Sequence, residues 1–330
     1  MNEPILSVSN LRKRFNLEAG FFARLGRYVH AVNGVSFSIG RNESYGLVGE
    51  SGCGKTTTAR LLVRMYEADE GEIIFQGEDA RKFKGKDFKC YRDKVKYVFQ
   101  DPARSLNPRM TVFDVLTSGA RWSTEKRKVA VLREEAASIL EEVGLSASDL
   151  EKRPAEFSGG QRQRISIARG LMMKPSLLIC DEVVSALDVS IQGQILNLLL
   201  DLRSHRESSR REISFLFIAH DLKVASYFCD RIGVMYAGEI MEEGPATDLW
   251  KTYKHPYTEL LFSSINNSIQ GGSTPTVTPL LSKATVATMH TDGCAFALRC
   301  PYAEERCLME KPELREVEIG HSVRCCKFMF

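Results

Sequence analysis

A glycine-rich segment near the N-terminus constrains the fold of this chain more than any other feature. It reads Gly49-Glu50-Ser51-Gly52-Cys53-Gly54-Lys55-Thr56 and lies between the apolar run Tyr45 to Val48 and an amphipathic segment, Thr57 to Tyr66. A strand, a glycine loop and a helix in this order form a phosphate cradle, because backbone N–H groups converge on one anion where the helix dipole also favours negative charge. The motif predicts that the chain binds ATP.

Five further blocks follow this loop in order along the chain. They are Gln100, Ser158-Gly159-Gly160-Gln161, Leu177-Leu178-Ile179-Cys180-Asp181-Glu182, Ser185-Ala186-Leu187-Asp188 and His220. The apolar run Leu177 to Cys180 is typical of a central parallel strand buried on both faces, and its end delivers two acids. Gln100 and His220 also follow apolar runs. We therefore expect these polar residues at one edge of an open sheet, where such sheets bind ligands.

The ordered set resembles the nucleotide-binding subunit of ATP-binding-cassette (ABC) transporters, from about Leu6 to Ser264. The resemblance implies an α/β fold, namely a P-loop NTPase domain of the ABC type with a mixed sheet core, an antiparallel β edge and a helical subdomain at about 101–173. We expect this ATPase domain to span 1–264. A linker and a Cys-rich extension of the oligopeptide-transporter type would occupy 265–330, since Asn266 to Thr291 is rich in Ser, Thr, Gly and Pro.

The expected chemistry is hydrolysis of ATP with Mg²⁺. Lys55 should contact the β and γ phosphates, while the hydroxyl of Thr56 and the carboxylate of Asp181 should hold the magnesium ion. Glu182 lies one residue further on, points elsewhere and is the expected general base. The predicted phosphate-binding residues are Gly49, Ser51, Gly52, Cys53, Gly54, Lys55, Thr56 and Thr57.

The resemblance also gives roles to two residues that sequence patterns alone would not single out. It implies that Gln100 touches magnesium or the attacking water and links the site to the membrane subunit. His220 matches the switch histidine of the family, near the γ-phosphate. Without the resemblance, Gln100 would be interpreted as a solvated loop residue and His220 as a structural histidine.

Ser158 is suited to cap a helix, so Ser158-Gly159-Gly160-Gln161 forms a second anion-binding helix N-terminus. The chain thus has two anion-binding helix N-termini but only one strand that ends in a pair of acids. This imbalance suggests that the site is shared between two chains. In the family, this segment of one subunit covers the γ-phosphate that the other subunit holds. The resemblance also implies that Asp188 of this chain contributes to nucleotide binding. We expect a monomer to bind ATP but to hydrolyse it poorly. The partner ATPase subunit could be different or identical.

Adenine needs an aromatic face for stacking, and Tyr28 is the first candidate, with Phe15 the alternative. The chain departs from the family at Val183, where proline commonly follows the glutamate. The charged loop His205 to Glu212 also looks longer than usual. Neither departure removes a reacting group.

Cysteines cluster at the C-terminal end of the chain. The sequence has nine cysteines, and those after residue 293 are Cys294, Cys300, Cys307, Cys325 and Cys326. With no export signal, metal ligation is favoured over disulfides. The tight knuckle usual for zinc is absent, and the wider spacing suits an iron–sulfur cluster.

The segment Gly293 to Pro301 and the motif His255-Pro256-Tyr257-Thr258 resemble the tail of oligopeptide, dipeptide and nickel importer ATPases. That tail can carry a [4Fe-4S] cluster, which implies Cys294, Cys300, Cys307 and Cys325 as ligands. Cys326 could replace Cys325, and zinc or unligated thiols remain alternatives.

Composition bears on the possible partners of the chain. No apolar run approaches the ~18 residues of a membrane span. A net charge of +3, against 45 basic and 42 acidic residues, gives no field for nucleic acid. The resemblance implies a peripheral subunit on the cytoplasmic face of the inner membrane, held by two transmembrane permease subunits and served indirectly by an extracytoplasmic solute-binding protein.

Two other classes of function would carry sequence features of their own. A soluble ABC ATPase of DNA repair or translation would be expected to have two cassettes or a long coiled-coil insertion, and neither is evident. A redox enzyme would need a G-x-G-x-x-G cofactor fingerprint, which is also not evident. The solute stays open, because peptides, nickel chelates, opines and sugar conjugates are all compatible.

Overall fold

The computed structural model describes residues 3–16, 28–185, 187–204, 212–270 and 293–329. The insert after Asn16, most of the charged loop 205–212 and most of the expected linker lie outside these ranges. The chain divides into two compact units. Unit one comprises Met1–Leu6, Ile39–Ser44 and Ile74–Ile218, and unit two comprises Ser7–Ser38, Tyr45–Ile73 and Ala219–Phe330.

Three parallel strands form the sheet of unit one, in the order β8 (Ser214–Ala219), β7 (Leu177–Asp181) and β6 (Val95–Val98). Every residue of β7 is buried, as its apolar run predicted. The register aligns Val98 with Cys180, and Asp181 with Ile218. Because parallel strands end at the same edge, the residues after β6 and after β7 emerge as neighbours.

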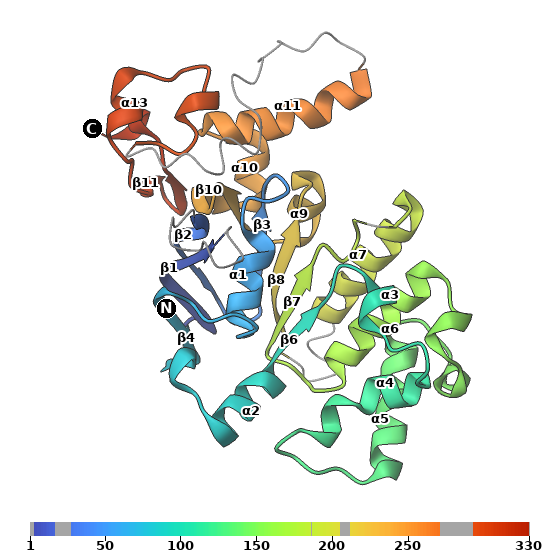
Figure 1. The fold of residues 1–330 in the computed structure, drawn as a ribbon. Helices are drawn as coiled ribbons and strands as arrows, with labels where there is room; N and C mark the ends of the chain where they lie inside the picture. The colour runs from blue at the N-terminus through green and yellow to red at the C-terminus, as the bar shows by residue number, and fades with distance from the viewer. Residues whose placement is uncertain (1–2, 17–27, 186, 205–211, 271–292, 330) are drawn as a thin grey trace. The chain divides into compact units, whose positions relative to one another are not determined.

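Helices make up most of the rest of unit one. Figure 1 shows α3 (Pro102–Ser105), α4 (Val112–Thr117), α5 (Val129–Glu142) and α6 (Gly159–Leu171) grouped together. The buried side chains of α5 recur three or four residues apart at Leu132, Ala136, Ile139 and Leu140. This stripe gives α5 an apolar face, and α5 packs against α4 and α6.

The remaining elements of unit one flank this group. The helix α2 (Gly85–Lys94) precedes β6, and α7 (Val189–Ser204) packs against α6. Short elements complete the unit: β5 (Glu78–Asp79), η2 (Ala80–Lys82), η3 (Gly119–Arg121), η4 (Ala147–Glu151) and η5 (Pro154–Glu156).

Unit two holds the glycine loop and two groups of strands. The first has the order β2 (Tyr28–Ile39), β1 (Leu6–Asn16) and β4 (Glu70–Phe75). In the second, β3 (Ser44–Val48) runs parallel to β9 (Arg231–Tyr236), which pairs antiparallel with β10 (Glu239–Pro245). The helices are α1 (Lys55–Leu62), α9 (Leu222–Phe228), α10 (Ala246–Thr252) and α11 (Pro256–Gln270).

The C-terminal extension packs within unit two. Its elements are η6 (Ala297–Arg299), α13 (Glu305–Met309), β11 (Arg315–Glu318), β12 (His321–Val323) and η7 (Cys326–Phe328). The strand β12 pairs antiparallel with β10, so the extension continues the sheet. The helix α11 runs across residue 264, and the predicted domain boundary there stays a prediction.

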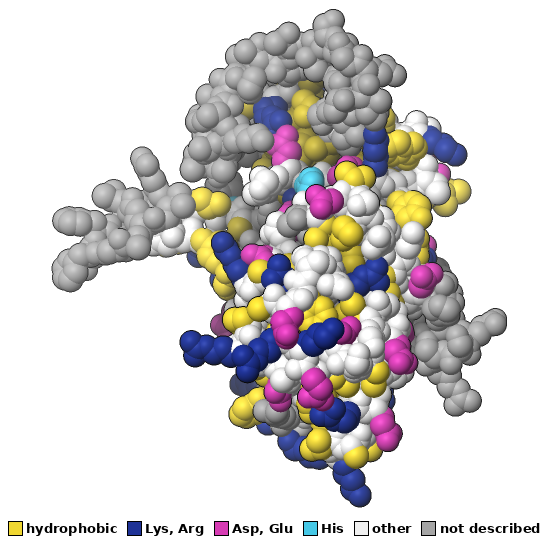
Figure 2. All heavy atoms as spheres, turned by 90° about the vertical axis from the view of Figure 1, so that its right-hand side faces the viewer, with side chains coloured by type: hydrophobic (Ala, Val, Ile, Leu, Met, Phe, Trp, Pro, Cys, Tyr) yellow, Lys and Arg dark blue, Asp and Glu magenta, His cyan; other side chains and the backbone are white. Residues whose placement is uncertain are grey.

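No helix in the described part of the chain is long and apolar enough to cross a membrane. The surface carries charges of both signs. On the face drawn in Figure 2, Lys and Arg side chains are interspersed with Asp and Glu side chains. This mixture agrees with the small net charge of the sequence, because neither sign gathers into one large area of that face.

A buried histidine makes the stability of unit two depend on pH. His255 is 1% exposed, and its Nδ1 accepts a hydrogen bond from the Tyr257 N–H at 3.0 Å. Burial lowers the pKa of His255 from 6.5 to about 4. The neutral form is therefore favoured in the folded state, so its contribution is present above pH 6.5 and is lost as the pH falls toward 4.

We expect His255→Asn, which keeps an acceptor near Nδ1, to show a smaller fall in melting temperature between pH 7 and pH 5 than wild type. Thermal unfolding at both pH values measures the difference. An identical fall in wild type and His255→Asn would contradict the assignment.

Candidate functional site

The glycine loop of unit two is shaped by close backbone contacts. Gly54 begins α1 with φ 111°, a left-handed conformation that side chains rarely adopt. A Cβ atom at this position would lie 2.1 Å from the carbonyl oxygen of Ala31. The loop therefore requires glycine here, which explains one of the spaced glycines of the sequence motif.

Lys55 is held inside this loop. Its side chain is buried, and its Nζ donates hydrogen bonds to the carbonyl oxygens of Gly49 at 2.8 Å and Glu50 at 2.9 Å. The Sγ of Cys53 lies 3.7 Å from the same Nζ. Burial raises the pKa of the Cys53 thiol, and the Lys55 cation opposes this only in part. The loop thus presents a fixed positive charge beside backbone N–H groups, an arrangement suited to phosphate.

The acids of unit one follow the central strand. Asp181 ends β7 with 3% of its surface exposed and accepts a hydrogen bond from the hydroxyl of Tyr97. Glu182 has φ 49°, a left-handed conformation that is uncommon outside glycine. Its carbonyl oxygen accepts a hydrogen bond from the Ser185 hydroxyl at 2.9 Å. Strained backbone of this kind persists where surrounding contacts hold it, and it is frequent at functional sites.

Gln100 contacts the second acid directly. Its Nε2 donates to Glu182 Oε2 at 2.7 Å and lies 3.4 Å from the Ser185 hydroxyl. The parallel register of β6 and β7 explains this contact, since both side chains follow strands that end at the same edge. The structure therefore brings together two predicted catalytic residues that lie 82 positions apart.

The Ser158 segment forms the predicted helix N-terminus. The Ser158 side chain accepts a hydrogen bond from the Gln161 N–H at 3.3 Å, and Gln161 Oε1 accepts one from the Ser158 N–H at 3.0 Å. This is a capping box at the start of α6. A Cβ on Gly160 would lie 2.7 Å from Ile191 Cγ2, so the close approach of α7 also requires glycine there.

The other predicted residues are exposed or engaged elsewhere. His220 directly follows β8 and is exposed, as is Asp188 just before α7. Tyr28 is 44% exposed, and the Arg14 guanidinium lies 5.0 Å from its ring centroid. Phe15 packs edge-on against Tyr66 with 5.4 Å between centroids. The adenine-stacking role of Tyr28 stays a prediction.

The C-terminal cysteines converge in unit two. They line one small cavity of about 20 Å³ together: Cys294, Cys300, Cys307, Cys325 and Cys326. Burial raises the pKa of Cys294 to about 11, with smaller contributions from three neighbouring thiols. Nevertheless, in the ranges that the structure covers, no group of three or more His, Cys, Asp or Glu side chains is arranged to hold a metal ion. The five thiols thus share one cavity, but the described side chains are not arranged as a metal centre, and the predicted ligand set stays a prediction.

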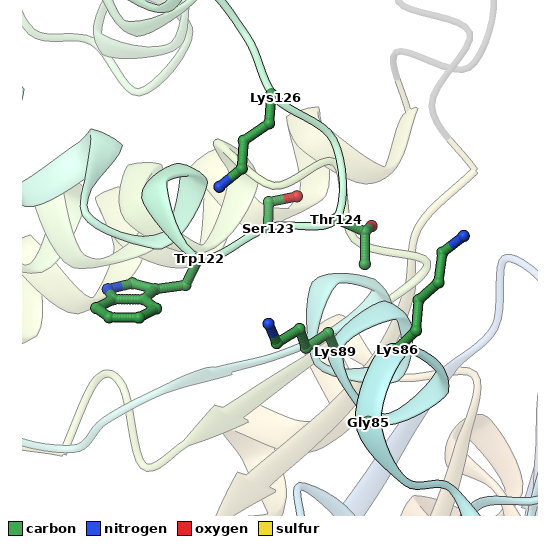
Figure 3. A pocket seen from close by; sticks show the side chains of 7 residues that line it. All are labelled: Gly85, Lys86, Lys89, Trp122, Ser123, Thr124 and Lys126. Atoms are coloured by element: carbon green, nitrogen blue, oxygen red, sulfur yellow. The ribbon is translucent and has the colours of Figure 1, made fainter.

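A basic pocket of unit one was not predicted from the sequence. It encloses about 610 Å³ and is lined by Gly85, Lys86, Lys89, Trp122, Ser123, Thr124 and Lys126. In Figure 3, Lys89 and Lys126 extend toward the side of the pocket where Trp122 lies, whereas Lys86 points away. Asp93 accepts a hydrogen bond from the Ser123 hydroxyl at 2.8 Å, which holds this wall against α2. Nothing in the spacing of these residues along the sequence indicates that they meet.

Glu50, inside the glycine loop, is a second feature that the sequence did not reveal. Its two carboxylate oxygens accept hydrogen bonds from the two terminal nitrogens of Arg299, each at 2.9 Å. Its backbone N–H donates to the Tyr257 hydroxyl at 2.9 Å. No local pattern could have shown these contacts, because each partner lies more than 200 positions away.

Comparisons with known proteins identify the family of this chain. The sequence matches the ABC transporter family over residues 32–185 and the C-terminal region of oligopeptide/dipeptide transporters over residues 241–307. It is 40% identical over 326 residues to the oligopeptide transport ATP-binding protein AppF of Bacillus subtilis, covering 98% of this chain and 97% of that protein. The chain belongs to the family of ATP-binding subunits of oligopeptide/dipeptide ABC transporters.

Solved structures share the fold. The cbiO1 protein of Clostridium perfringens, part of the ABC transporter complex cbiONQ, superposes with a TM-score of 0.64 at 24% identity, covering 82% of this chain and 97% of that protein. The ATP-binding cassette MJ0796 has a TM-score of 0.62 at 24% identity, covering 73% and 98%. The predicted ABC-type P-loop NTPase fold is therefore confirmed. The chain is an ATPase that uses ATP with Mg²⁺, and the soluble ABC ATPase alternative is not favoured.

The loop geometry predicts the effect of removing its buried amine. Lys55→Ala should weaken binding of Mg-ATP by about tenfold or more, because a hydrogen bond from a charged group contributes roughly 1.5–3 kcal/mol. Isothermal titration calorimetry measures the dissociation constant. Lys13→Ala, which removes an amine paired with Asp69 in the same unit, is the control and should bind like wild type. Equal affinity in Lys55→Ala and wild type would count against the phosphate-binding role.

Proposed function

We propose that this chain powers an importer for peptides or a related small solute. The observation that carries the proposal is the combination of a phosphate loop with the hydrogen-bonded pair of Gln100 and Glu182 in a chain of this family. The relative AppF is named an oligopeptide transport protein, and the matched C-terminal region belongs to oligopeptide/dipeptide transporters. ATP binding would close two ATPase subunits, and hydrolysis would reopen them.

Within this proposal, each reacting group has a role that follows from its chemistry. Lys55 neutralises charge on the β and γ phosphates, as in other phosphate loops. Glu182 accepts a proton from the attacking water, and Gln100, bonded to its carboxylate, orients that carboxylate and the water. His220, which is exposed directly after β8, would contact the γ-phosphate as a polar group.

A magnesium ion would be held by oxygen donors, which are the ligands that this ion prefers. The chain offers the hydroxyl of Thr56, the side-chain oxygen of Gln100 and the carboxylate of Asp181. Asp181 fits this role because its carboxylate is buried and is hydrogen bonded to Tyr97, so its position is defined. Bound magnesium would neutralise charge on the phosphate oxygens.

The partners follow from the same proposal. The capped N-terminus of α6, with Ser158, Gly159, Gly160 and Gln161, would cover the γ-phosphate held by a second ATPase subunit, and Asp188 would lie at that interface. Two transmembrane permease subunits would hold the ATPases at the cytoplasmic face of the inner membrane. An extracytoplasmic solute-binding protein would deliver the solute to those permeases.

Glu182→Gln tests the catalytic assignment. Glutamine keeps the size of the side chain and an acceptor for Gln100 but cannot take up the proton. We expect Mg-ATP binding to be retained and turnover to fall by about 10²-fold or more, as for loss of a general base. Phosphate release and size-exclusion chromatography with ATP measure turnover and the trapped dimer.

Glu151→Gln is the matched control, because Glu151 is exposed and forms an ion pair with Arg133 in the same unit. It should hydrolyse ATP at the wild-type rate. Brisk turnover in Glu182→Gln would remove Glu182 as the base. Full activity of demonstrably monomeric wild-type protein would instead remove the shared site.

We also propose that the cysteine cluster binds a [4Fe-4S] cluster through Cys294, Cys300, Cys307 and Cys325. Their convergence on one cavity supports the proposal. The side chains would have to rearrange, since the described residues hold no group placed to bind a metal ion. Bound iron would keep the thiols deprotonated, and we assign it no step in ATP hydrolysis.

Anaerobically purified protein should contain iron and sulfide with the visible absorption of a cluster. Cys307→Ser should lose both, whereas Cys90→Ser, which removes a thiol of α2 in unit one, should retain them. Zinc without iron or sulfide in the anaerobic protein would contradict the cluster.

A further inference from the structure

One ion pair connects the cysteine-bearing segment to the phosphate loop. Arg299 ends η6 immediately before Cys300, and its guanidinium makes two hydrogen bonds of 2.9 Å to the Glu50 carboxylate. The side chains of Arg299 and Glu50 are 15% and 20% exposed. A two-fold contact between a planar guanidinium and a carboxylate is both strong and directional. The pair is therefore a specific contact within unit two rather than a loose surface interaction.

Aromatic rings hold the arginine in this position. Its guanidinium lies 5.4 Å from the ring centroid of Tyr236 and 5.8 Å from that of Phe296. Phe296 is fully buried and packs against Tyr236 and Tyr257. Glu50 raises the pKa of Arg299 further above its usual value, so the side chain stays a cation. The positive charge beside Glu50 is thus both permanent and fixed.

Glu50 occupies a position where its charge matters for ATP. Its carbonyl oxygen accepts a hydrogen bond from Lys55, and its N–H donates to the Tyr257 hydroxyl. A carboxylate beside a loop that binds a triphosphate repels that ligand unless a cation neutralises it. Arg299 is the cation that contacts both oxygens of this carboxylate.

The extension does not depend on Arg299 for its attachment. The strand β12 pairs with β10, and His321 Nε2 lies 2.8 Å from Glu242 Oε1. Arg324 donates from Nε to the carbonyl oxygen of Ile240 at 2.9 Å. Removing the Arg299 side chain should therefore change the charge at Glu50 while the extension stays packed on unit two.

We propose that Arg299 is a positioning residue for nucleotide binding: the cysteine-bearing extension supplies it to neutralise Glu50 and to hold the phosphate loop ready for the triphosphate. This inference rests on the proposed ATP-binding role of the loop. It makes the extension a functional part of the nucleotide site. Any change that displaces the extension, for example at Cys300, would then alter the affinity for ATP through this contact.

The test compares Mg-ATP dissociation constants by titration calorimetry in full-length protein. Arg299→Ala should bind about tenfold more weakly than wild type, within the 5- to 150-fold range typical of coupled sites. Arg299→Lys keeps the charge but not the two-fold contact and should recover part of the loss. Arg315→Ala, which removes an arginine paired with Glu313 in the same extension, should bind like wild type.

A second variant separates the charge effect from general damage to the fold. Glu50→Gln combined with Arg299→Ala should bind Mg-ATP more tightly than Arg299→Ala alone and recover part of the loss, because no uncompensated carboxylate remains. Wild-type affinity for Mg-ATP in Arg299→Ala would overturn the proposal. The proposal would also be overturned if the double variant had the wild-type melting temperature but bound Mg-ATP as weakly as Arg299→Ala.

The outcome is distinguishable from failure of the proposed function. If wild type itself does not bind Mg-ATP, or if Lys55→Ala binds as well as wild type, the role of the phosphate loop is wrong. If Lys55→Ala is impaired while Arg299→Ala is not, the loop binds ATP and only the inference about Arg299 is wrong.

Discussion

The parallel pairing of β7 with β6 and β8 is the constraint on which the residues proposed for catalysis in unit one depend. Because β7 is buried on both faces, the polar residues that follow it can be accommodated only at the edge of the sheet where the strand ends. The same register brings the end of β6 alongside, so that Gln100 reaches Glu182 across 2.7 Å. The strained φ of Glu182 is held by this frame, since its N–H donates to Ile218 and its carbonyl accepts from Ser185.

In unit two, the phosphate loop is held by contacts from far along the chain. Gly54 accommodates the carbonyl of Ala31, and Lys55 is turned back onto the carbonyls of its own loop. Glu50 joins this loop to the C-terminal extension through Tyr257 and Arg299. The extension thus shares hydrogen bonds with the loop as well as adding strands to the sheet of unit two. These contacts are the route by which we propose that the extension acts on nucleotide binding.

Much of the fold could be predicted because short local sequence patterns specify it. The apolar run at Leu177 to Cys180 specified a buried strand, and the glycine spacing before Lys55 specified a loop that opens a helix. Ser158 followed by Gln161 specified a capping box. The cysteine cluster was foreseen as a group, but its arrangement was not, because side-chain placement depends on the packing of η6, η7 and α13 rather than on spacing.

The sequence by itself determined the class of protein and predicted its reacting groups, since each motif consists of only a few adjacent residues with a defined chemistry. The tertiary structure alone decided which distant charges meet. Arg299 and Glu50 lie 249 positions apart, and the local sequence around either residue does not indicate that the two form an ion pair. The lysines around Trp122 likewise gather only when α2 and the segment after η3 pack together. Pairings of this kind depend on the whole path of the chain, because they are set by how its elements pack and not by any local preference.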